Sequence, residues 1–130
     1  TILGAIRSEV NGLTTYFSSS MDGGHTWETM HSPIAGSPPH FLLHSSGRII
    51  CTYGYREKPF GIRAVISEDN GKSWQTDIIL RDDGIDWDLG YPSSVELSNG
   101  DILTIYYMKA GNDVTDNTSL LATRWSLNEI

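Results

Sequence analysis

The sequence predicts an all-β protein made of β-propeller blades, and three observations support this. Short runs of β-branched and aromatic residues are separated by turn residues, including thirteen glycines and five prolines, which is typical of many short strands. No stretch of about twelve residues keeps its apolar side chains at helical spacing. A motif also recurs along the chain, and a period of about 20 to 50 residues is typical of repeat folds.

The recurring motif is Ser-x-Asp-x-Gly-x-Thr/Ser-Trp. It occupies residues 20–27 and again 67–74, so every matched position is shifted by 47 residues. Residues 1–3 match 48–50 at the same shift, and 101–103 begin a third copy 53 residues further on. A unit of four strands and about 45 residues has the size of a propeller blade. A β-sandwich of about ten strands is the alternative, but it does not require a period.

The repeat divides the chain into one complete unit and two incomplete ones. The middle unit, 37–82, has expected strands near 39–45, 48–56, 61–67 and 74–81. The first unit, 1–36, lacks the first of these strands and has the others near 2–8, 13–19 and 27–31. The last unit, 83–130, lacks the outer strand and has the others near 92–98, 102–109 and 119–126. We therefore expect two and a half to three blades of a larger ring, with open blade faces that can self-associate.

The motif has the chemistry of a turn that satisfies its own hydrogen bonds. The Asp carboxylate can accept backbone N–H groups, the Gly supplies a positive φ angle, and the Trp fills the space between blades. We therefore expect a structural role for both copies, which consist of Ser20, Asp22, Gly24 and Trp27, and of Ser67, Asp69, Gly71 and Trp74.

Alternating hairpins place these two turns on one rim and a set of charged and aromatic residues on the other. That second rim collects Arg7, Glu9, Tyr55, Arg56, Arg63, Asp86, Trp87, Asp88, Tyr91, Tyr107 and Lys109. Guanidinium groups bind carboxylates through paired hydrogen bonds, and aromatic rings pack on sugar rings. This combination favours recognition of an acidic sugar.

The segments around the motifs resemble the C-terminal half of the exo-α-sialidase (neuraminidase) family, a six-bladed propeller with Asp-boxes. In that family a substrate-binding arginine ends a strand shortly before an Asp-box, and Arg7 matches this position. The nucleophilic tyrosine opens the first strand of the last blade, and residues 90–100 are similar to that segment, which makes Tyr91 the matching residue. Pro92 departs from the family, where a small hydroxyl residue is commoner. For a further arginine the candidates are Arg56, which we prefer, and Arg63.

The resemblance implies a retaining hydrolase that removes terminal sialic acid from glycoconjugates, without a cofactor, in a secreted or periplasmic protein. A neutral tyrosine suits this substrate because the sugar's own carboxylate would repel a carboxylate nucleophile. The family's early arginine, acid/base aspartate and tyrosine-paired glutamate would precede Thr1. The chain alone is therefore expected to be catalytically incomplete.

Two other functions fit the same sequence. One is a non-catalytic Asp-box propeller that binds glycans or protein partners. The other is a related propeller glycosidase of different specificity, in which Asp86 and Asp88 form a carboxylate pair.

Charge and composition disfavour several classes of partner. A formal net charge of -7 repels nucleic acid. The longest apolar runs have three residues, whereas a membrane span needs about 20. We predict no metal site, because the spacing of Asp82, Asp83, Asp86 and Asp88 does not fit an EF-hand loop.

Overall fold

The structure is a computed structural model that describes residues 1–9, 15–111 and 117–130. In these residues the chain forms three antiparallel sheets, followed by a short 3₁₀ helix at Leu127–Glu129. The prediction of an all-β protein is confirmed, and the arrangement is propeller-like. Within the described ranges, no helix is long and apolar enough to cross a membrane.

Each sheet is built from strands that follow one another along the chain. The first sheet contains β1 (Ile2–Arg7), β2 (Thr15–Ser20) and β3 (Glu28–His31). The second contains β4 (Pro39–Leu43), β5 (Ile49–Tyr55), β6 (Phe60–Ser67) and β7 (Gln75–Gly84). The third contains β8 (Gly90–Glu96), β9 (Ile102–Met108) and β10 (Ser119–Trp125). Every strand overlaps a range expected from the repeat, although residues 13 and 14 of the expected 13–19 strand lie outside the described residues.

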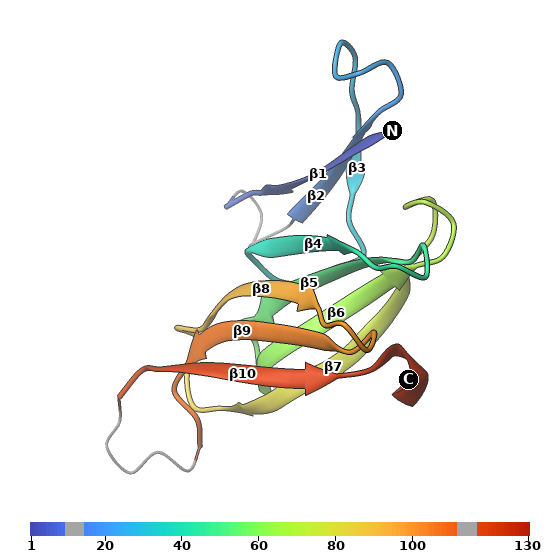
Figure 1. The fold of residues 1–130 in the computed structure, drawn as a ribbon. Coiled ribbons are helices and arrows are strands. Elements are labelled where there is room, and N and C mark those ends of the chain that lie inside the picture. Colours follow the sequence, from blue (N-terminus) through green and yellow to red (C-terminus); the bar gives the residue numbers. More distant parts are fainter. Residues whose placement is uncertain (10–14, 112–116) are drawn as a thin grey trace.

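The second sheet lies between the other two (Figure 1), with β4 against β1 and both β4 and β5 against β8. Strands β5 and β6 are buried along almost their whole length, because the second sheet has a neighbour on each face. This explains why their sequences are apolar without strict alternation.

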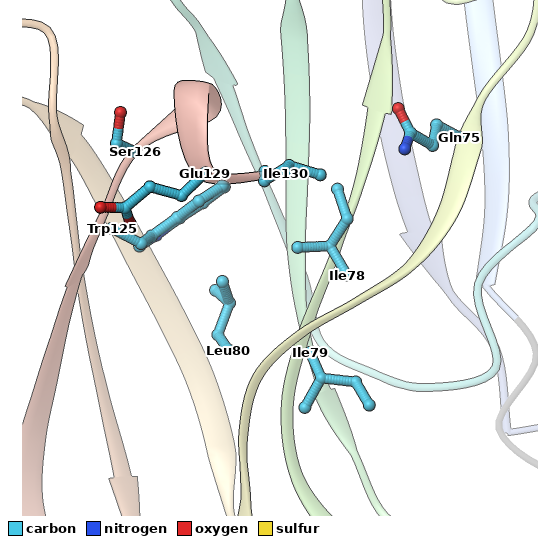
Figure 2. A pocket seen from close by; sticks show the side chains of 8 residues that line it. All are labelled: Gln75, Ile78, Ile79, Leu80, Trp125, Ser126, Glu129 and Ile130. Atoms are coloured by element: carbon cyan, nitrogen blue, oxygen red, sulfur yellow. The ribbon is translucent and has the colours of Figure 1, made fainter.

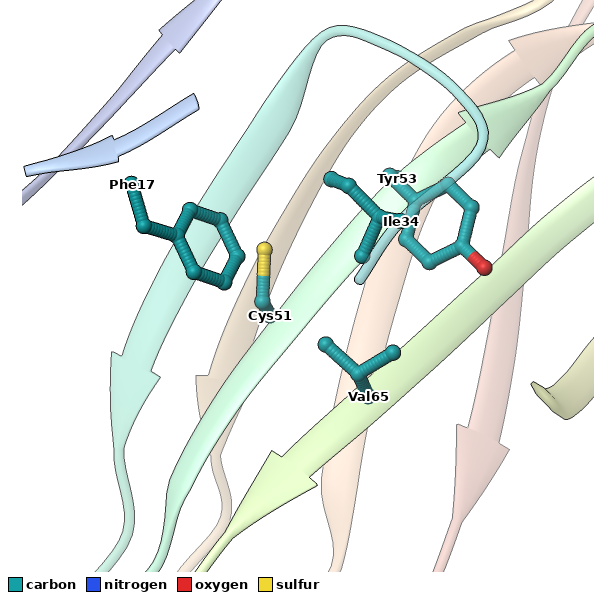
Figure 3. Packing of buried hydrophobic residues seen from close by; sticks show 5 residues of the cluster. All are labelled: Phe17, Ile34, Cys51, Tyr53 and Val65. Carbon is teal, nitrogen blue, oxygen red and sulfur yellow. The ribbon is translucent and has the colours of Figure 1, made fainter. Parts of the chain in front are cut away.

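The core consists of apolar side chains between successive sheets. Between the first and second sheets lie Phe17, Ile34, Cys51, Tyr53 and Val65 (Figure 3). Two further clusters, which include Ile50 with Ile102 and Ile62 with Tyr106, join the second and third sheets. Burial raises the pKa of the Cys51 thiol far above its usual range, so this cysteine is a core residue without thiolate chemistry.

The 20–27 turn, between β2 and β3, is closed by hydrogen bonds to one carboxylate. Asp22 Oδ1 accepts the backbone N–H groups of His25 at 3.0 Å and Thr26 at 2.9 Å. Asp22 Oδ2 accepts the Thr26 hydroxyl at 2.6 Å. The Ser20 hydroxyl donates to Asp22 at 2.9 Å and accepts the N–H of Gly24 at 2.8 Å.

The 67–74 turn, between β6 and β7, repeats these hydrogen bonds. Asp69 accepts the N–H groups of Lys72 at 3.0 Å and Ser73 at 2.8 Å, and the Ser73 hydroxyl at 2.6 Å. In both turns the tryptophan indole donates to the glycine carbonyl, at 3.0 Å from Trp27 and 3.2 Å from Trp74. The two turns therefore have one geometry, and it is set within eight residues of chain.

We expect the two turns to make the fold sensitive to acid. Hydroxyl and amide donors, with Thr26 and Ser73 foremost, lower the pKa of Asp22 and of Asp69 from 3.8 to about 2. Because folding lowers these pKa values, the stabilisation is complete above about pH 4 and is lost as the pH falls towards 2. The urea midpoint should fall across this range, and Asp22→Asn combined with Asp69→Asn should flatten the dependence. An equally steep pH dependence in the double variant would contradict this.

Candidate functional site

Arg7 and Tyr91 lie at the same end of the molecule, opposite the Asp-containing turns. In the first sheet Arg7 pairs with Thr15, whereas Ile2 pairs with Ser20 at the other end, next to the 20–27 turn. Tyr91 lies at the start of β8. The candidate site, here called the Arg7 rim, consists of Arg7, Arg56, Trp87, Asp88, Tyr91 and Tyr107.

A hydrogen bond joins the two central residues of this rim. Arg7 Nη1 donates to the Tyr91 phenol oxygen at 3.3 Å, although 84 residues separate them. Arg7 Nη2 donates to Glu9 Oε1 at 2.9 Å. The Arg7 side chain is 32% exposed, and Tyr91 is 58% exposed. A guanidinium therefore lies beside a phenol oxygen that a ligand can reach.

The backbone at Tyr91 adopts a conformation that large side chains rarely take. Its φ angle is 49° and that of Gly90 is 120°, and the pairing of β8 with β9 shifts between Gly90 and Ser93. A non-glycine residue in the left-handed region costs about 1–3 kcal/mol, and such residues concentrate at functional sites. Tyr91 is exposed between buried Gly90 and buried Pro92, in step with the alternating burial along β8.

Close backbone packing keeps the bulge in place. A Cβ atom on Gly54 would lie 2.8 Å from the Ser37 carbonyl oxygen and 3.0 Å from Gly90 Cα. Gly54 follows Tyr53 in β5, so the second sheet presses directly against the backbone that carries Tyr91. The close approach of the two sheets therefore requires glycine at positions 54 and 90.

Tyr107 and Asp88 form a second polar pair next to Tyr91. The Tyr107 phenol donates to Asp88 Oδ1 at 2.7 Å, and the rings of Tyr107 and Tyr91 lie 6.0 Å apart between centroids. Burial raises the pKa of Tyr107, the Asp88 carboxylate raises it further, and the charge of Arg56 opposes the increase. Tyr107 is therefore a neutral hydrogen-bond donor at neutral pH.

The two remaining arginine candidates occupy different places. Arg56 Nε donates to the Leu89 carbonyl at 3.2 Å, its guanidinium lies 6.0 Å from the centre of the Trp87 ring, and its charge acts on Tyr107. The Arg63 guanidinium lies over the Tyr55 ring at 3.5 Å. The hydrogen bond to Leu89, the residue after Asp88, links Arg56 to the loop that carries Trp87 and Asp88 of the Arg7 rim.

Acidic residues at the end of β7 and in the loop before β8 bind nearby basic and backbone groups. Asp86 forms an ion pair with Lys109 at 3.2 Å and accepts the N–H of Asp88 at 2.9 Å. Asp83 binds Arg81 through two hydrogen bonds, at 2.6 and 3.0 Å. In the part of the chain that the structure describes, no group of three or more His, Cys, Asp or Glu side chains could hold a metal ion.

Two hollows of about 380 Å³ each lie away from the Arg7 rim. One lies between β7 and the C-terminal turn (Figure 2), where Ile78, Leu80 and Trp125 line it. The other lies between the first sheet and the 67–74 turn and includes Leu3 and Met30. Neither is lined by Arg7 or Tyr91.

Sequence reasoning placed all six residues on this rim but missed how they pair. The Arg7–Tyr91 and Tyr107–Asp88 hydrogen bonds and the bulge at Tyr91 were not predicted. The signal for the bulge was the glycine directly before Tyr91, since glycine in a strand often marks a bulge.

Comparison with known proteins gives a structural neighbour without a known function. No family model matches the chain, and no curated protein matches it. The chain is similar to a crystal structure described as a protein of unknown function from Dyadobacter fermentans DSM 18053, with 29% sequence identity and a TM-score of 0.81. The match covers 95% of this chain and 34% of that protein, so the chain spans about a third of its neighbour's length.

Proposed function

We propose that this chain forms the C-terminal portion, with Asp-box blades, of a six-bladed sialidase-like glycoside hydrolase that removes terminal sialic acid with retention. The observation that carries this proposal is the hydrogen bond between Arg7 and the exposed Tyr91 phenol. The strained backbone at Tyr91 supports it as well, because strain of this kind persists where function requires a fixed side chain. The neighbour from Dyadobacter, about three times as long, supports action within a larger protein.

In this proposal Arg7 binds the carboxylate of the substrate. Its Nη1 and Nη2 groups donate to Tyr91 and Glu9, so both terminal nitrogens are directed towards the rim. A planar guanidinium with two N–H groups on one side matches a carboxylate through paired hydrogen bonds. Arg7 Nη2 already binds a carboxylate, that of Glu9, which is the same chemical group as the one that the proposed substrate carries. Arg56 would add a second positive charge near Tyr107.

Tyr91 is the proposed nucleophile. Its phenol oxygen bonds to the anomeric carbon as the bond to the leaving oxygen breaks, and the leaving oxygen takes a proton from an acid. The phenol proton passes to a base. Water then attacks the same carbon, releases the sugar and returns the tyrosine. By the family resemblance, the acid is an aspartate and the base a glutamate outside these 130 residues.

We expect Arg7→Lys, in the complete polypeptide that carries this chain, to lower kcat/KM for an aryl sialoside. Lysine keeps the charge but loses the planar pair of N–H groups, and one hydrogen bond to a charged group corresponds to about 10- to 100-fold. Steady-state hydrolysis rates measure this effect. No turnover by an intact wild-type protein that still binds sialosides would favour the non-catalytic, glycan-binding propeller.

Glu9→Gln provides the matched comparison for Arg7→Lys. Glu9 is well exposed and competes for Arg7 Nη2, and an exposed ion pair contributes little to stability. Removing its charge should leave folding unchanged and lower KM by up to about fivefold, since an exposed pair is worth about 0.2–1 kcal/mol. A raised KM would contradict the assignment of Arg7 as the carboxylate-binding group.

A further inference from the structure

Trp87 is a large apolar side chain that the structure holds in an exposed position. It is 62% exposed in the loop between β7 and β8. The residues on both sides of it are fixed, by the Asp86–Lys109 ion pair at 3.2 Å, the Tyr107–Asp88 hydrogen bond at 2.7 Å and the complete burial of Leu89. The loop is therefore anchored on either side of an indole that faces water.

The position of Trp87 connects it to the Arg7 rim. The Arg56 guanidinium lies 6.0 Å from its ring centre, and Arg56 also binds the Leu89 carbonyl at 3.2 Å. Asp88, the residue after Trp87, accepts the Tyr107 phenol at 2.7 Å, and the Tyr107 ring lies 6.0 Å from that of Tyr91. Trp87 thus lies in the loop that borders the Arg7 rim, on the side of Arg56 and Tyr107.

We propose that Trp87 determines substrate specificity by stacking on the neutral sugar unit to which the acidic sugar is attached. This inference rests on the proposed function. An exposed indole offers a flat apolar surface, and the C–H face of a pyranose covers it and releases water. Stacking on a nucleic-acid base would use the same ring, but a net charge of -7 opposes binding of phosphate backbones.

The test compares a ligand of one sugar with a longer one. The complete polypeptide is titrated calorimetrically with methyl α-sialoside and with sialyllactose, in a Tyr91→Phe background that prevents hydrolysis. Trp87→Ala should weaken sialyllactose binding about fivefold to tenfold, the range expected for one aromatic contact, and leave methyl sialoside binding unchanged. Trp87→Phe should recover part of the loss. Ile85→Ala, an apolar truncation in the same loop, is the control and should change neither affinity.

The possible results separate the two proposals. Selective loss for sialyllactose in Trp87→Ala supports the stacking role. Equal weakening of both ligands, or no change in either, overturns it and leaves the proposed function in place. If the parent protein binds neither ligand, the proposed function fails, and the specificity role of Trp87 fails with it.

Discussion

Tyr91→Phe is expected to lower kcat for an aryl sialoside by at least about 10³-fold, because it removes the oxygen of the proposed nucleophile. The ring remains, so its contact with Tyr107 and the backbone bulge are kept. Affinity for a sialic-acid analogue should therefore change little. The measurement is single-turnover hydrolysis together with a binding titration, in the complete polypeptide.

Tyr16→Phe serves as the control for this experiment. It makes the same chemical change in the first sheet, where the Tyr16 ring packs against His31. Tyr16 pairs with Ile6, so its side chain lies on the sheet face opposite that of Arg7. It should leave kcat unchanged. Equal turnover in wild type and Tyr91→Phe would remove Tyr91 from the mechanism, and loss of analogue binding would assign the phenol to substrate binding.

Gly54→Ala should have the second large effect, on both stability and catalysis. Its Cβ atom would lie 2.8 Å from the Ser37 carbonyl oxygen and 3.0 Å from Gly90 Cα, and these are backbone atoms that cannot rotate away. Overpacking of this kind costs about 1–3 kcal/mol. Moving Gly90 also moves Tyr91 relative to Arg7, and a displacement of about 1 Å can lower catalysis about 10²-fold. Urea unfolding and steady-state kinetics measure the two effects.

Gly4→Ala is the matched control for Gly54→Ala. A Cβ atom at Gly4 would make only ordinary contacts, at 3.8 Å from the Ser18 carbonyl and from the Trp27 ring. Stability and activity should both stay close to wild type. If Gly54→Ala behaved in the same way, the packing of the second sheet against Gly90 would not be what positions Tyr91.

The sequence determined the parts of this protein whose interactions are short in range. The order of strands, the period of 47 residues and the positions of the turns could be derived from it, because strand alternation and turn chemistry depend on near neighbours. The two Asp-containing turns illustrate this. Among the residues that the structure describes, the hydrogen-bond partners of Asp22 all lie within four positions of it, so eight residues of sequence specify this network.

The geometry of the candidate site was decided by tertiary structure. Arg7 and Tyr91 meet across 84 residues, and their contact depends on how the first and third sheets pack against the second. The bulge between Gly90 and Ser93 changes the strand register, and a shift of one residue reverses which side chains face outwards. Burial nevertheless alternates residue by residue along β8 and includes the exposed Tyr91, so the shifted pairing with β9, and not this exposure, depends on the packed sheets. The positions of the Arg56 guanidinium beside Trp87 and of the Arg63 guanidinium over the Tyr55 ring likewise depend on how the sheets and loops pack.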